Sequence, residues 1–140
     1  MKKGFTLLEV IIVIIIIGIL ATLGLTQFGR IAEKARGAEA KAIIGTLRDL
    51  GAAFRLERGT VAGITNPDFG LGTGAGDVPS ACAGTHYFSY GAACVEPSCT
   101  FTATRCTGGG KIPQGGVAGT LTLATNYTSG LDTWGGTGGY

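Results

Sequence analysis

The stretch MKKGFTLLEVIIVIIIIGIL, residues 1–20, decides the fold of this 140-residue chain. Residues 10–29 carry no charge, and a helix of that length spans roughly 30 Å, the thickness of the hydrocarbon core of a bilayer. One long helix, apolar on all sides at its start, is therefore expected. Glu9 stands directly before the apolar run. An unpaired carboxylate at the centre of a membrane helix costs about 2.5 to 3.5 kcal/mol, so an acid here requires an explanation.

Two ordinary membrane-targeting functions leave this acid unexplained. A secretory signal with Lys2 and Lys3 as its positive region is disfavoured, because the apolar run is too long for one. The residues after it, QFGRIAEKARGAEAKA, also do not form a short polar stretch with a small-residue cleavage site. A plain transmembrane anchor, oriented by the same lysines on the cytoplasmic side, agrees with everything except Glu9.

The segment KKGFTLLEV resembles the start of type IV prepilins and of type II secretion pseudopilins, which have a short basic leader, Gly, Phe, and a Glu four residues after that Phe. The resemblance implies that a membrane aspartyl peptidase, the prepilin peptidase, cuts between Gly4 and Phe5 and that Phe5 is then N-methylated. It also implies that Glu9 pairs with the Phe5 amine of a neighbouring subunit during assembly. Within one helix, residues 5 and 9 lie on the same face, one turn apart.

The residues after Gly29 continue the helix with a different pattern. Apolar residues recur at 40, 43, 44, 47, 50 and 54, which is the spacing of one helix face. One nearly continuous helix is predicted from Phe5 to about Glu57, ending near Gly59. Many type IV pilins have a proline shortly after the middle of the apolar run, and this chain has Thr26 in that region.

The remainder of the chain predicts a small antiparallel sheet. A loop, GITNPDFGLGTGAGDVPS, precedes three alternating runs rich in β-branched or aromatic residues, near 85–91, 99–106 and 119–126. Trp134, in the glycine-rich tail, is expected to pack on the sheet. The predicted fold class is α+β and pilin-like: the amphipathic half of the long helix packs on the sheet to form a head. The predicted divisions are 1–4 leader, 5–29 membrane and assembly segment, 30–58 amphipathic helix and 59–140 β head.

All four cysteines lie between Cys82 and Cys106, in a small loop-rich region behind an export-like segment, which predicts two disulfides formed outside the cytoplasm. Three pairings are possible. The pairing Cys94–Cys99 is favoured because the intervening VEPS makes a four-residue hairpin loop, and it leaves Cys82–Cys106. The cysteine spacings contain no C-x-x-C pair, which argues against zinc.

Catalytic and ligand-binding functions find little support. The chain has one histidine, His86, no G-x-S-x-G and no recognisable pair of carboxylates, so no enzymatic activity and no cofactor are expected. Asp68, Asp77 and Asp132 stand in glycine-rich loops, and the heads of some major pseudopilins bind calcium. No spaced ligand loop accompanies these acids, and solvated loop acids with no bound metal are favoured.

Nucleic acid is not an expected partner either. The chain has eleven Lys and Arg residues against nine Asp and Glu, so it is only weakly basic. The basic residues of the head, Arg105 and Lys111, are too few for a nucleic-acid surface. The sequence Asn126 to Thr128 matches a glycosylation acceptor by pattern alone, and this is discounted in a bacterial-type prepilin.

These observations favour a structural subunit of a type IV pilus-like extracellular filament, which polymerises with identical or homologous pilin subunits through its apolar helix. The precursor is expected in the inner membrane and the product in a cell-surface or periplasm-spanning filament. The first alternative is a pseudopilin of a type II secretion system, whose short filament pushes substrates through an outer-membrane pore. The alternative from another class is a membrane-tethered binding domain that does not polymerise.

Overall fold

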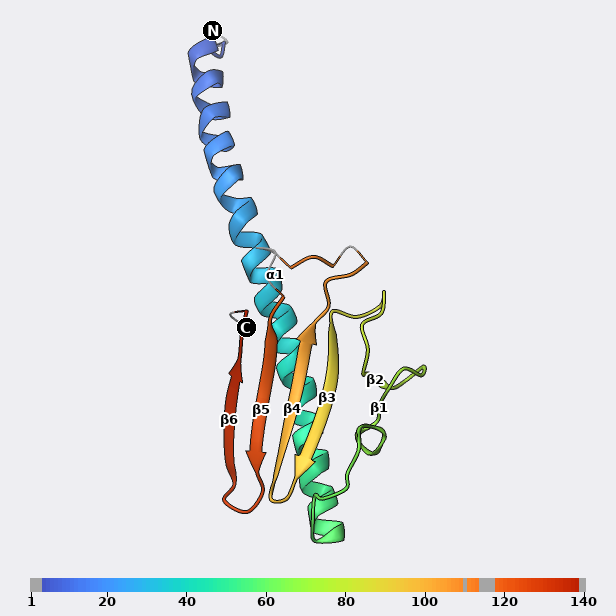
Figure 1. Cartoon of the computed structure of the whole chain (residues 1–140). Helices are drawn as coiled ribbons and strands as arrows, with labels where there is room; N and C mark the ends of the chain where they lie inside the picture. Colours follow the sequence, from blue (N-terminus) through green and yellow to red (C-terminus); the bar gives the residue numbers. More distant parts are fainter. Residues whose placement is uncertain (1–3, 110, 114–117, 139–140) are drawn as a thin grey trace. The chain divides into compact units, whose positions relative to one another are not determined.

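The computed structural model describes residues 4–109, 111–113 and 118–138. The chain divides into two compact units, Met1–Ala32 and Glu33–Tyr140. One helix, α1 (Leu7–Arg58), is followed by a four-stranded antiparallel sheet, which confirms the predicted α+β class and the pilin-like order of elements (Figure 1). The boundary between the units falls close to the predicted change from the apolar to the amphipathic part of the helix.

Residues at its two ends determine where the helix α1 begins and ends. Its first helical residue is Leu7, so the prediction that Phe5 is helical was wrong, and Thr6 precedes the first turn as its cap. At the other end Gly59 has φ +75°, a left-handed conformation that glycine adopts without a steric penalty and that commonly terminates helices.

The second half of α1 buries one stripe, as its sequence pattern predicted. Ala40, Ile44 and Leu47 are each at most 1% exposed. Leu50 departs from the predicted stripe and is 43% exposed. The next buried position is Gly51, against which the Tyr127 ring packs while its hydroxyl donates a hydrogen bond of 2.9 Å to the Arg48 carbonyl. A side chain at residue 51 would collide with that ring.

The sheet has the order β3-β4-β5-β6 and is antiparallel throughout. Its strands are β3 (Phe88–Val95), β4 (Ser98–Arg105), β5 (Thr120–Asn126) and β6 (Leu131–Gly136). The runs predicted near 99–106 and 119–126 differ from β4 and β5 by one residue at one or both ends, whereas β3 starts later than predicted and extends to the turn. The fourth strand, β6, was not predicted. Trp134 belongs to β6 opposite Leu123 and is still 47% exposed, so it does not pack on the sheet as a buried side chain.

The segment between α1 and the sheet is more ordered than its composition predicted. It contains a short 3-10 helix, η1 (Asn66–Phe69), and two paired two-residue strands, β1 (Leu71–Gly72) and β2 (Val78–Pro79). Phe69 is 2% exposed and meets Phe54 of α1 and Phe101 of β4 edge to face, with ring centroids 5.8 and 5.3 Å apart. The segment therefore covers one side of the core.

The core lies between the second half of α1 and one face of the sheet, within the unit Glu33–Tyr140 (Figure 1). Inward positions alternate along β4, where Cys99, Phe101 and Ala103 are fully buried. Burial of a side chain the size of Phe101 or Ile44 contributes about 1.5 to 3 kcal/mol to folding. This packing attaches the sheet to the amphipathic part of the helix.

Candidate assembly site

Glu9 is held by the residue that begins the helix. The backbone N–H and the hydroxyl of Thr6 donate hydrogen bonds of 2.9 and 2.8 Å to Glu9 Oε2, and the Glu9 N–H donates one of 3.3 Å to Thr6 Oγ1. This reciprocal arrangement is a capping box, which satisfies N–H groups that the first turn of a helix leaves without partners. The carboxylate therefore has a function within a single chain.

The predicted site residues Gly4 and Phe5 lie just before the helix, in a segment without regular secondary structure. Phe5 is 85% exposed, and because it precedes the first turn, it does not share a helix face with Glu9. The expected one-turn relationship between these residues is thus wrong for this chain. Residues 1–3 of the predicted leader lie outside the described part of the structure. Gly4 and Phe5 are both exposed.

The apolar part of α1 is not covered by the rest of the described chain. The large side chains from Val10 to Leu25, all of them Ile, Leu or Val, are 42 to 74% exposed. Within the described residues, α1 is the single helix long and apolar enough to cross a membrane, and none of its apolar window is buried. A contiguous apolar surface of this length is covered in the cell by lipid or by protein.

The head contains a buried ion pair that the sequence did not predict. Arg105 Nε and Nη2 donate hydrogen bonds of 3.1 and 3.0 Å to the two carboxylate oxygens of Glu33, and the Arg105 side chain is completely buried. Its Nη1 donates to the carbonyls of Cys106 and Tyr87 at 2.6 and 3.3 Å. The pair joins the helix to the last residue of β4.

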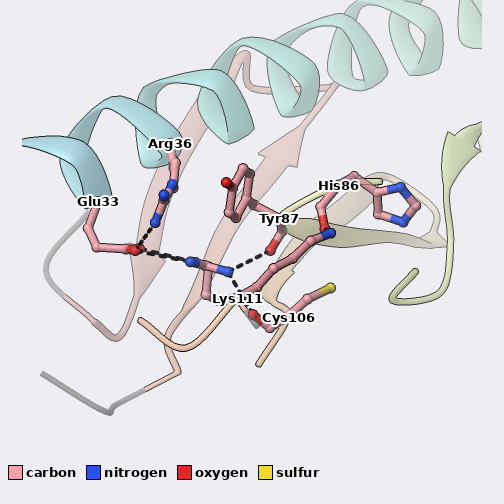
Figure 2. A network of polar contacts seen from close by, with 7 residues as sticks. Glu33, Arg36, His86, Tyr87, Cys106 and Lys111 are labelled. Carbon is pink, nitrogen blue, oxygen red and sulfur yellow. Dashed lines mark hydrogen bonds and ion pairs between the residues drawn. The ribbon is translucent and has the colours of Figure 1, made fainter. Parts of the chain in front are cut away.

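Further cations surround the Tyr87 ring beside this pair, as Figure 2 shows. Arg36 also pairs with Glu33, and its guanidinium carbon lies 4.1 Å from the ring centroid. Lys111 Nζ lies 5.3 Å from the centroid of the Tyr87 ring and donates hydrogen bonds to the carbonyls of Ala83 and His86. Hydrogen bonding to Arg105 lowers the pKa of Glu33 below its usual value; burial opposes this effect, and Arg36 adds to it. The Glu33 carboxylate stays ionised at neutral pH. Together these contacts hold the segments around Tyr87 and Lys111 against α1.

Arg105, which the sequence presents only as one of two basic residues of the head, is buried rather than at the surface. A signal was present in the alternation of β4, because Arg105 follows Cys99, Phe101 and Ala103 at a spacing of two and so shares their inward face. What the sequence did not indicate is the partner, since Glu33 lies far away along the chain. Arg105 is thus engaged inside the protein, and the half-buried Lys111 donates hydrogen bonds to backbone carbonyls.

The four cysteines form two bonds in the structure, Cys82–Cys106 and Cys94–Cys99, with Cα atoms 5.6 and 4.1 Å apart. Cys94 and Cys99 lie directly opposite each other on β3 and β4. The predicted four-residue loop is shorter, because Val95 pairs with Ser98 and leaves only two turn residues. The other bond joins Cys82, in the segment before β3, to Cys106, which directly follows β4 and the buried Arg105.

The loop acids considered for calcium each have a protein partner. Asp68 accepts hydrogen bonds of 2.8 Å from the Thr65 N–H and hydroxyl, Asp77 accepts one of 2.9 Å from the Gly74 N–H, and Asp132 pairs with Arg48. The bonds from Thr65 lower the pKa of Asp68. No group of three or more His, Cys, Asp or Glu side chains in the described residues is arranged to hold a metal ion.

The prokaryotic N-terminal methylation motif matches residues 1–25. It is the class III prepilin leader of type IV pilins and pseudopilins, and it contains Gly4, Phe5 and Glu9. The motif implies processing by prepilin peptidase and assembly with other pilin subunits, and proteins of the pilin type are structural rather than enzymatic. No solved structure matches the chain. The leader and the apolar helix together support a membrane-anchored precursor of the pilin or pseudopilin class.

Proposed function

We propose that this protein is a structural subunit of a type IV pilus-like extracellular filament and that it polymerises through the apolar part of α1. The observation that carries the proposal is a leader motif joined to a helix whose apolar first part, from Val10 to Leu25, remains exposed. Cleavage between Gly4 and Phe5 leaves this helix in the mature protein. The same surface then contacts lipid before assembly and neighbouring helices afterwards.

The geometry at the start of α1 supports a double function for Glu9. Among the described residues, both hydrogen bonds that its carboxylate accepts, from Thr6, go to Oε2. The cap therefore leaves Oε1 available for another donor. Cleavage creates a positive amine at Phe5, and a carboxylate in an apolar bundle is stabilised by such a group. We infer that Oε1 accepts the N-methylated amine of Phe5 from a neighbouring subunit, which sets the register between helices.

The head is proposed to fold outside the cytoplasm, where its two disulfides persist. A pilin and a secretion pseudopilin share all of these features, and they differ in whether the filament reaches the cell surface or ends in the periplasm. Cell fractionation of the assembled protein distinguishes the two locations.

Substitutions at Glu9 test the proposal. Glu9→Gln keeps the capping box, which accepts Gln at this position, but removes the charge. We expect normal cleavage and membrane insertion but a loss of sheared filament, because the incoming amine has lost its carboxylate. Glu9→Leu should give the same result, although it improves the segment as a membrane anchor.

Thr6→Ala is the matched control, because it removes hydroxyl contacts of the cap and leaves the charge at Glu9. A lost cap costs about 0.5 to 2 kcal/mol at the end of a long helix, and filament yield should largely persist. The measurement compares sheared filament with the membrane pool for each variant. Normal filament yield from both Glu9 variants would refute the charge-pairing mechanism. The absence of any filament from the wild-type chain, with its partner proteins present, would favour the tethered binding domain.

A further inference from the structure

The head has a pocket at one end and a projecting side chain at the other. The pocket, of about 500 Å³, lies between α1 and the edge of the sheet and is lined by Lys41, Thr120, Leu121 and residues 134–137. Gly135 and Gly136 place no side chain in it, so Trp134 and Leu121 supply its apolar wall. Lys41 is exposed and has no ion pair with any described residue. The pocket therefore suits a ligand with an apolar group and an acid.

The C-terminal end of α1 presents that combination. Leu56 is 89% exposed, more than any other large apolar side chain of the described residues. Its neighbour Glu57 is exposed as well, and it forms no ion pair in the part of the chain that the structure describes. The cations on either side are already engaged, since Arg55 pairs with Glu96 and Arg58 with Asp68. Among the described residues at this end of the head, Glu57 is thus an acid without an ion-pair partner.

The pocket and the projection belong to opposite ends of the same unit. Thr120, at the pocket, is the first residue of β5, and Tyr127, beside Leu56, directly follows its last residue. Lys41 and Glu57 lie 16 residues apart on α1, which corresponds to about 24 Å of helix. The two side chains cannot pair within one chain. A contact between them requires a second copy.

We propose that Leu56 and Glu57 of one subunit dock into the pocket of the next subunit along the filament, with Leu56 against Trp134 and Glu57 paired with Lys41. This inference rests on the proposed function, since it assumes parallel subunits in one filament. Two different surfaces at opposite ends form a heterologous contact, which repeats without closing. The contact complements the one between the apolar helices, and it fixes the spacing of the heads rather than of the helices.

Charge exchange in the full-length chain tests the contact. Lys41→Glu and Glu57→Lys each place like charges in the docked pair, and each should lower the sheared filament fraction roughly fivefold or more. The double variant, Lys41→Glu with Glu57→Lys, restores opposite charges across the contact and should recover most of the wild-type yield. The matched control replaces Lys34, an exposed lysine of α1 outside the pocket, and combines Lys34→Glu with Glu57→Lys. This control should show no recovery.

The readouts separate this contact from the filament function itself. All three substituted residues are exposed, so a thermal melt of each variant should match the wild type and exclude misfolding. If the wild-type chain forms filaments and both single reversals leave the yield unchanged, the docking is overturned and the pocket has another occupant. Equal recovery by the control pair would also overturn it, because net charge alone would then explain the effect. A wild-type chain that forms no filament refutes the proposed function instead.

Discussion

Removing Glu33 should destabilise the head more than removing any exposed charge. In Glu33→Leu, the guanidinium of Arg105 stays completely buried and loses two hydrogen bonds of 3.0 and 3.1 Å together with its counter-charge. Loss of one partner from a buried pair costs about 3 to 5 kcal/mol, because the remaining charge is uncompensated. For a unit of this size, that cost lowers the melting temperature by roughly 10 to 20 °C.

The assay is thermal unfolding of the full-length protein in detergent, followed by near-ultraviolet circular dichroism of the head aromatics. Arg36→Gln is the control, since Arg36 binds the same carboxylate from a more exposed position and its pair should be worth about 1 kcal/mol. Glu33→Leu combined with Arg105→Met removes both charges and should recover most of the loss. A Glu33→Leu melt within 2 °C of the control would refute the uncompensated-charge explanation.

The same pair predicts a dependence on acid. The pKa of Glu33 is lowered in the folded head, chiefly by its hydrogen bonds from Arg105. A folded state that holds a carboxyl pKa below its unfolded value gains stability that is complete above the unfolded pKa. That stability should be lost as the pH falls through the lowered folded pKa. The acid-induced decrease should be smaller in the variant that lacks both charges.

Two further predictions concern maturation and the disulfides. Gly4→Val should block cleavage and leave membrane insertion intact, because the peptidase needs close approach to the backbone. Mass spectrometry of wild-type filaments should find N-methyl-Phe5, and an intact Met1 terminus in assembled material would contradict this. Loss of the Cys82–Cys106 bond, with 24 residues of separation, should cost about 3.5 kcal/mol, against about 2 kcal/mol for Cys94–Cys99, with a separation of 5. Melts of the two double serine variants measure the difference, and peptide mapping that finds four free thiols would exclude both bonds.

The features that the sequence predicted are those with strong local periodicity. An uninterrupted apolar run followed by an amphipathic stripe predicts a helix, because the apolar residues of the stripe recur at the spacing of one helix turn. The three predicted strands alternate between buried and exposed positions, and β4 and β5 keep that alternation in the structure. Local chemistry was enough for these elements.

The strand β6 was missed for a physical reason. All six of its residues are exposed, so the segment LDTWGG has no buried face to produce alternation, and its glycines are typical of a loop. It is a strand because β5 offers an unpaired edge to which it hydrogen bonds. The Glu33–Arg105 pair was missed for a related reason. Its two residues are brought together only by the packing of the sheet on the helix, and a charged residue in isolation is expected at the surface.

The capping box sharpens the question of why residue 9 is an acid. A cap alone is served equally by glutamine, which carries no charge and costs less to place beside lipid. Thr6 already supplies two hydrogen bonds to Oε2, so the cap needs only one oxygen of the side chain. The helix end therefore does not need the negative charge of Glu9, and under the proposed function that charge pairs with a positive group of a neighbouring subunit. The proposed cleavage would create such a group, the amine of Phe5, and for this reason Glu9→Gln is more informative than any substitution that also removes the cap.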